Sequence, residues 1–191
     1  MLQRIGSSAM LACTLWLAAG GLGTAAATPV SVQVFAQGNS SSGAGVDLDT
    51  GIDLGSGDRL VSSVDPLDCW SAGADPRVSN ANGLNGLSPA PCQPTSNFGL
   101  YSQDGESFPY GALVGRIDAS DWFMLGTSFD AVVPYTGRLF LVYWDSNSSD
   151  NSGSVTARIE VNPAQVPLPG SLALAVAGLA LLTVRRRRRL H

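Results

Sequence analysis

Lysine is absent from this chain, and its single histidine, His191, is the last residue. Charged side chains make up only 14% of the 191 residues, and five of the 11 arginines stand together near the C-terminus. Between residues 28 and 163, five arginines face 15 acidic residues, which gives this part a formal net charge of −10. Such a charge repels phosphate backbones and argues against nucleic-acid binding. It favours solubility and the attraction of cations instead.

The same scarcity limits catalysis. Without lysine or a usable histidine, acid–base and nucleophilic chemistry would fall to carboxylates alone. Asp118 and Asp121 are a candidate pair, but both lie near predicted strand ends, where solvated caps are the simpler role. We therefore expect this protein not to be an enzyme.

Residues 1–27 have the pattern of a signal peptide. Arg4 precedes an apolar stretch from about residue 9 to 22, and Ala25-Ala26-Ala27 offers a cleavage site with small residues. The protein is therefore predicted to be exported. Of the three cysteines, Cys13 lies in the apolar stretch and would be removed with it. Cys69 and Cys92 remain, and an isolated pair in an oxidising compartment favours a disulfide over free thiols or a metal site.

Residues 28–163 show almost no helix signal and many short strands separated by Gly, Pro, Asn and Ser. This pattern predicts an all-β, antiparallel β-sandwich. We expect a flexible loop over residues 38–45, and a long loop over residues 65–110 of the kind in which binding sites are often built. Strands are predicted at residues 30–34, 49–54, 59–64, 111–117, 122–125, 139–144 and 155–161.

The last two predicted strands are the most distinctive. Residues 139–144 are apolar at every position, which is typical of a strand buried on both faces. Residues 155–161 alternate between apolar and polar side chains, as a half-solvated strand does. The two are predicted to form a hairpin around the loop Asp145–Gly153, whose sequence is DSNSSDNSG.

This loop is rich in side-chain oxygens, which suits a hard cation such as Ca2+. The spacing of Asp145, Asn147 and Ser149 is that of an EF-hand, but the sixth position is Asp150 rather than Gly and the twelfth is Thr156 rather than Glu. A polar turn without metal is the alternative, because Asp, Asn, Ser and Gly also accept turn conformations.

Residues 164–191 change character. An apolar stretch over residues 168–184 is close to the shortest length that spans a membrane as a helix, and the arginines after it should stay cytoplasmic. A plain tail anchor is one reading. The order of Pro motif, apolar helix and Arg cluster also resembles the PEP-CTERM sorting signal, which implies recognition by an exosortase protease and delivery to the cell surface or extracellular matrix. The residues that carry this resemblance are Pro167, Leu168, Pro169, Arg185, Arg186, Arg187, Arg188 and Arg189.

The middle of the chain resembles the LecA-type galactophilic lectins, which are small calcium-dependent sugar-binding β-sandwiches of jelly-roll-like architecture. The similar pieces occur in order at residues 49–52, 57–58, 69–71, 110–117, 137–141, 145 and 150–153. The resemblance implies side-chain ligands to Ca2+ from Asp145, Asp150 and Asn151, with backbone carbonyls near Ala72 and Asn147. In the family, the bound calcium takes two sugar hydroxyls as further ligands.

The sugar side differs from the family pattern. The lectin's binding histidine has no counterpart, and Trp144 stands where an Asn usually precedes the first acidic ligand. The loop between Asp75 and Pro109 is expanded relative to the family. It offers Tyr101, Gln103 and Asp104 as candidate sugar contacts beside Asp145 and Asp150, although positions in a solvated loop are the simpler role for these three. Galactose specificity is therefore not expected.

Two functions follow from these observations. The first is an exported surface or matrix module that binds an extracellular polysaccharide or glycan through calcium. The second is a structural biofilm or matrix protein whose calcium, if bound, only stiffens the fold. In both, the C-terminal helix would hold the chain in the membrane before an exosortase processes it.

We predict that the tail directs membrane targeting and then release or surface attachment, because its three parts occur in the order that the PEP-CTERM resemblance requires. Intact-mass analysis of protein extracted from the cell surface should find a chain without residues 185–189. Recovery of these arginines on the surface protein would leave a permanent anchor as the role of the tail.

Overall fold

The computed structural model describes residues 28–164, and every regular element in this range is a β-strand. The predicted signal peptide and the predicted C-terminal helix lie outside the described residues. Within residues 28–164 there is no helix long and apolar enough to cross a membrane. The strands are β1 (Val30–Phe35), β2 (Leu48–Leu54), β3 (Arg59–Val64), β4 (Trp70–Ser71), β5 (Val78–Ser79), β6 (Leu100–Gln103), β7 (Glu106–Pro109), β8 (Ala112–Ile117), β9 (Phe123–Met124), β10 (Ser128–Val132), β11 (Gly137–Trp144) and β12 (Ser152–Asn162).

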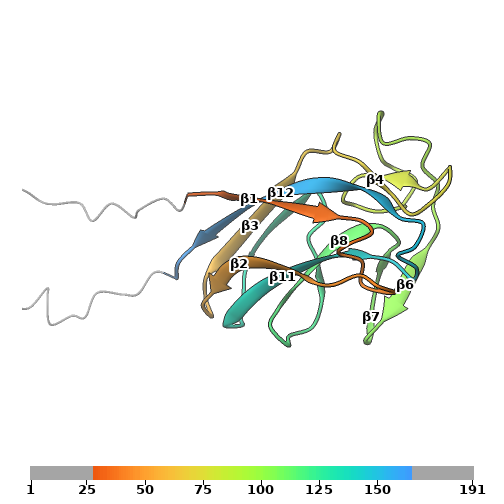
Figure 1. Cartoon of the computed structure of the whole chain (residues 1–191). Coiled ribbons are helices and arrows are strands. Elements are labelled where there is room, and N and C mark those ends of the chain that lie inside the picture. Colours follow the sequence, from red (N-terminus) through yellow and green to blue (C-terminus); the bar gives the residue numbers. More distant parts are fainter. Residues whose placement is uncertain (1–27, 165–191) are drawn as a thin grey trace, which may run out of the picture.

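Two antiparallel sheets pack face to face, which confirms the predicted all-β antiparallel architecture (Figure 1). In the first sheet, β12 lies between β3 and β1, β10 extends the β3 side, and β4 and β5 continue from the beginning of β12. The second sheet has the order β2-β11-β8-β9. The hairpin of β6 and β7 stands apart from both sheets.

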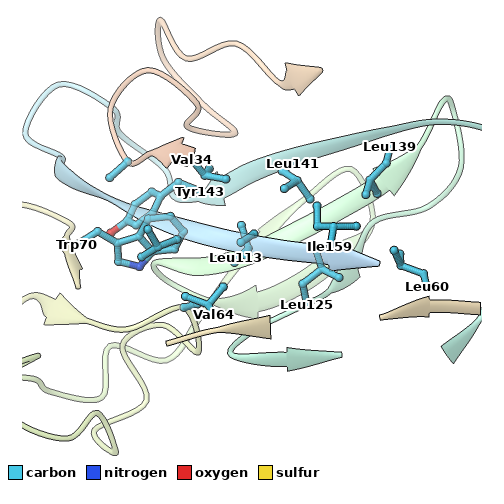
Figure 2. Packing of buried hydrophobic residues seen from close by; sticks show 14 of the residues in the cluster. Val34, Leu60, Val64, Trp70, Leu113, Leu125, Leu139, Leu141, Tyr143 and Ile159 are labelled. Atoms are coloured by element: carbon cyan, nitrogen blue, oxygen red, sulfur yellow. The ribbon is translucent and has the colours of Figure 1, made fainter. Parts of the chain in front are cut away.

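The main core fills the space between the sheets. On β12, Val155, Ala157 and Ile159 are buried while the side chains between them are exposed, as the alternating sequence predicted. The core is aliphatic along most of its length and ends in an edge-to-face pair of Trp70 and Tyr143, whose ring centroids lie 4.5 Å apart (Figure 2).

Strand β11 is buried on both faces, again as predicted. Its inner side chains Leu139, Leu141 and Tyr143 belong to the main core. Its outer side chains Val142 and Trp144 belong to a second cluster, which the side chains of the β6–β7 hairpin cover. A continuous apolar sequence is therefore explained by two separate cores on either side of one strand.

The predicted hairpin of the last two strands is wrong. Strand β11 belongs to the second sheet and β12 to the first, so residues 145–151 cross from one sheet to the other. Hairpin turns and inter-sheet crossings use the same short polar residues, so the loop sequence does not separate them. The flexible loop expected at residues 38–45 also differs, because it lies along this crossing and is hydrogen-bonded to it.

A disulfide joins Cys69 to Cys92, as predicted. Cys69 directly precedes β4, and Cys92 is fully buried in the long connection that follows β5. The bond therefore ties the segment around Cys92 to the start of β4, which pairs with the beginning of β12.

Replacing both Cys69 and Cys92 with Ser should lower the free energy of unfolding by roughly 3 kcal/mol, because the reduced chain regains the entropy of a loop of this length. Urea unfolding of the oxidised protein and of the double variant measures the difference. Equal midpoints and equal slopes would show that the bond adds nothing to stability.

Candidate functional site

The inter-sheet crossing at residues 145–151 lies at one end of the sandwich. Strand β12 starts at this crossing and runs to the opposite end, where Ile159 pairs with Val30 at the start of β1. Both ends of the described chain are therefore at the far end from the crossing (Figure 1). The β6–β7 hairpin and β4 lie at the same end as the crossing.

Asp145 directly follows the doubly buried strand β11 and is itself only 5% exposed. Its backbone N–H donates to the hydroxyl of Ser41, which donates in turn to the Asp145 carbonyl, both at 3.1 Å. Its Oδ1 accepts the Ser146 N–H at 2.8 Å. Burial raises the pKa of Asp145, while bonds from the Ser146 N–H and the Asn151 side chain act in the opposite direction.

The rest of the crossing is held in a compact turn. Asn147 Nδ2 donates to Asp150 Oδ1 at 2.9 Å, and Asn147 Oδ1 accepts the Ser149 N–H at 3.2 Å. The buried Ser148 hydroxyl accepts the N–H of Ala44. These contacts present Asp150 at the surface, 43% exposed, while Asp145 lies beneath it.

Asn151 ends the crossing and is only 4% exposed. Its Nδ2 donates to the carbonyl of Ala36 at 3.2 Å. Its Oδ1 is buried and has no hydrogen-bond partner among the described residues. A buried amide oxygen without a partner costs about 1–3 kcal/mol, so a ligand or ion that occupied this position would stabilise the fold.

A pocket of about 270 Å³ opens beside the crossing. This volume is slightly below that of pockets for drug-sized ligands and suits a small, polar molecule. Four of the residues that the sequence assigned to calcium line it: Ala72, Asp145, Asn147 and Asp150. Asn151, the fifth, does not line this pocket but a neighbouring one, together with Phe35 and Gln37. Its side chain acts to lower the pKa of Asp145.

Close backbone packing brings the Ala72 segment to this pocket. A Cβ atom on Gly73 would lie 2.5 Å from Asp150 Oδ2, and Gly73 has a φ of +109°, which L side chains rarely adopt. Glycine at position 73 thus allows the chain after β4 to approach the Asp150 carboxylate.

Five further residues line the pocket and were not singled out from the sequence: Arg77, Leu84, Phe98, Tyr110 and Ser146. The Arg77 guanidinium carbon lies 5.3 Å from the centroid of the Phe98 ring. Its Nη1 lies 3.5 Å from Asp150 Oδ2 and 3.3 Å from the Ala72 carbonyl oxygen. The sequence held one signal for this group of residues, because Arg77 is the one arginine in the predicted loop over residues 65–110.

The candidate sugar contacts Tyr101, Gln103 and Asp104 do not line this pocket. They belong to the β6–β7 hairpin, where the Tyr101 hydroxyl donates to Gln103 Oε1 at 3.1 Å and Asp104 occupies the turn with a φ of 53°. Gln103 Nε2 donates to the carbonyl of Ser41 and so connects the hairpin to the segment that holds Asp145. Of the three, Tyr101 lies near the pocket, since its ring centroid is 5.4 Å from that of Tyr110, which lines it.

Trp144 points away from the pocket. Its Nε1 donates to the Tyr101 carbonyl at 2.8 Å, and its ring packs against Tyr101, Phe108 and Trp122 on the outer face of the second sheet. Asp118, one of the two acids considered for catalysis, accepts the backbone N–H of Arg138 through Oδ1 at 3.0 Å.

The donor set at the pocket fits calcium. Among residues 28–164, no three His, Cys, Asp or Glu side chains gather where they could hold a metal ion, so a zinc-type site is not supported there. Calcium, however, also accepts amide and backbone carbonyl oxygens. The buried Asp145 carboxylate, the unpartnered Asn151 Oδ1, Asp150, and the nearby Ala72 and Asn147 supply oxygen ligands of these kinds.

Neither a family model nor a curated protein matches the chain. Among solved structures, it is similar to a chain described as "EclA N-terminal domain; PllA-like lectin", with a TM-score of 0.47 and 18% sequence identity. The alignment covers 69% of this chain and 94% of the other.

Proposed function

We propose that residues 28–164 form a calcium-dependent carbohydrate-binding module. The observation that carries this proposal is the convergence of Ala72, Asp145, Asn147 and Asp150 on one pocket, from segments more than 70 residues apart. Buried Asn151 ends the same crossing, and its amide oxygen has no partner within the described part of the chain. This arrangement is costly without a cation and useful with one.

In this proposal, one set of residues binds the calcium ion and another contacts the sugar ring. Asp145, Asp150 and Asn151 would hold Ca2+ through side-chain oxygens, with the carbonyls of Ala72 and Asn147 close by. When bound, the ion would supply open ligand positions for sugar hydroxyls. Phe98, which is 41% exposed, and Tyr110 supply apolar ring surface on which the C–H face of a sugar can pack.

The direction of the pocket suits a protein displayed on a surface. The described chain begins and ends at the end of the sandwich opposite to the pocket, so a tail attached there would leave the pocket open to the medium. Together with the predicted signal peptide and the PEP-CTERM-like tail, this arrangement supports export, passage through the membrane, and exosortase-dependent delivery to the cell surface or matrix.

One contact favours the alternative function, a structural matrix protein without a working calcium site. Arg77 Nη1 approaches two of the proposed calcium ligands, Ala72 and Asp150, and places a positive charge beside them. This ion pair is 3.5 Å long and joins two side chains that are each more than 40% exposed. Such a pair stabilises by no more than about 1 kcal/mol, which a bound divalent cation would readily exceed.

Calcium should raise the melting temperature of the protein, because an ion that binds only the folded state stabilises it by mass action. If the dissociation constant is near 10⁻⁴ M, 10 mM calcium adds about 2.7 kcal/mol, or roughly 5–10 °C for a domain of this size. Differential scanning calorimetry in calcium and in EDTA measures the shift.

Asp145→Asn should remove this shift while the metal-free protein still folds, because Asn can accept the Ser146 N–H as Asp145 does. Asp65→Asn is the matched control. It removes an equal charge from an exposed carboxylate that accepts the Leu67 N–H, and it should keep the full calcium shift. Identical melting of the unaltered protein in calcium and EDTA would contradict the proposed site.

Carbohydrate binding should disappear with the calcium. On a glycan array, the exported protein should retain specific polysaccharide or oligosaccharide ligands in calcium and lose them in EDTA, whereas a structural matrix protein would retain none in either. Binding to galactose alone should be weak, because the histidine that the lectin resemblance requires is missing. Turnover of a glycoside on the array would instead indicate an enzyme.

A further inference from the structure

Arg77 differs from Arg59, Arg116 and Arg138 in where its charge is paired. Arg59 is bound to Asp130 through both Nε and Nη2, and Arg138 uses three nitrogens on Asp49 and Asp53. Arg116 pairs with Asp47 and stacks on Trp122. Each of these guanidinium groups is held by carboxylates outside the pocket.

Arg77 instead is paired at the pocket and, like Arg116, through a single nitrogen. Nη1 makes both of its polar contacts, and within residues 28–164 Nε and Nη2 have no hydrogen-bond partner. The side chain is 44% exposed, lines the pocket and rests over the Phe98 ring. An arginine with one free edge can bind a carboxylate through two parallel N–H bonds.

The charge balance of the pocket points to the same ligand. Asp145, Asp150 and Arg77 together leave one net negative charge, which repels an anion. A bound Ca2+ would reverse this to one net positive charge, in a domain whose remaining surface is strongly acidic. Anionic ligands would then be attracted to this end of the sandwich only when calcium is present.

We infer that the pocket selects an acidic sugar, a uronic acid residue, whose carboxylate pairs with the free edge of Arg77 while its ring packs beside Phe98 and Tyr110. This inference rests on the proposed calcium-dependent sugar binding and narrows it to a substrate class. It also gives a function to the long loop predicted over residues 65–110, since this segment supplies all three of these side chains.

The test compares sugars that differ only in the oxidation of C6. Calorimetry on the full chain, purified after export in a detergent without a sugar headgroup, would use the methyl glycosides of galactose and galacturonate, glucose and glucuronate, and mannose and mannuronate, all with calcium. In at least one pair the uronate should bind about tenfold to a hundredfold more tightly, as a charge-assisted hydrogen-bonded pair provides. Added salt should weaken the uronate more than its neutral partner.

Variants at position 77 assign the selectivity. Arg77→Gln should reduce the affinity for the uronate to that for the neutral sugar and leave the neutral sugar nearly unchanged. Arg77→Lys should recover part of the difference, since it keeps the charge but not the planar fork. Arg158→Gln is the matched control, because Arg158 is exposed on the outer face of β12 and its loss removes the same charge. A retained calcium-induced melting shift in Arg77→Gln shows that the pocket is still formed.

The outcomes separate the inference from the proposed function. Equal calcium-dependent affinity for the two members of every pair overturns the acidic-sugar inference and leaves sugar binding intact. An equal loss of both members in Arg77→Gln also overturns it, because Arg77 would then only support the pocket. No binding of any of the six sugars in calcium overturns the acidic-sugar inference, and the proposed function is overturned with it only if the glycan array also shows no calcium-dependent ligand.

Discussion

The burial of β11 on both faces is the constraint from which the rest of the pocket follows. Its inner side chains complete the sandwich core, and its outer side chains, above all Trp144, need a second cover. The β6–β7 hairpin provides that cover and is connected by Gln103 to Ser41, which holds the backbone of Asp145. Because β11 is surrounded in this way, the residue that follows it is buried, and that residue is a carboxylate.

A buried carboxylate is costly, and the surrounding polar groups offset only part of the cost. Asp145 receives one short backbone hydrogen bond from Ser146, and its pKa is still raised by burial. The unpartnered oxygen of Asn151 lies in the same region. In a domain without lysine, the one guanidinium at this place is that of Arg77, held at a distance of 3.5 Å from Asp150. The proposed calcium ion would neutralise the carboxylates and bind the unpartnered oxygen. The proposed acidic sugar would pair with the Arg77 guanidinium.

Much of the strand arrangement could be predicted because period-2 patterns are local. The alternation of residues 155–161 and the continuous apolar run of residues 139–144 correctly gave one half-exposed and one doubly buried strand. The short strands β4 to β7 were missed, because two to four residues among many Pro, Gly and Asn carry no detectable period. Strand β10, at residues 128–132, was missed as well. The hairpin prediction was wrong in the pairing of the strands. Both strands were identified, but β11 pairs with β8 and β12 pairs with β3, which lie elsewhere in the sequence.

By itself, the sequence determined the class of fold, the disulfide and the acidic character of the domain, because strand periodicity, cysteine number and charge are properties of residue types and their near neighbours. Through the lectin resemblance it also named Asp145, Asn147, Asp150, Asn151 and Ala72 as a group. The packing of the two sheets was needed to show that the crossing buries Asp145, that Tyr101, Gln103 and Asp104 do not line the pocket, and that Arg77, Phe98 and Tyr110 do. These facts depend on how the connections pass between two packed sheets, and such long-range contacts leave no local pattern for the sequence to show.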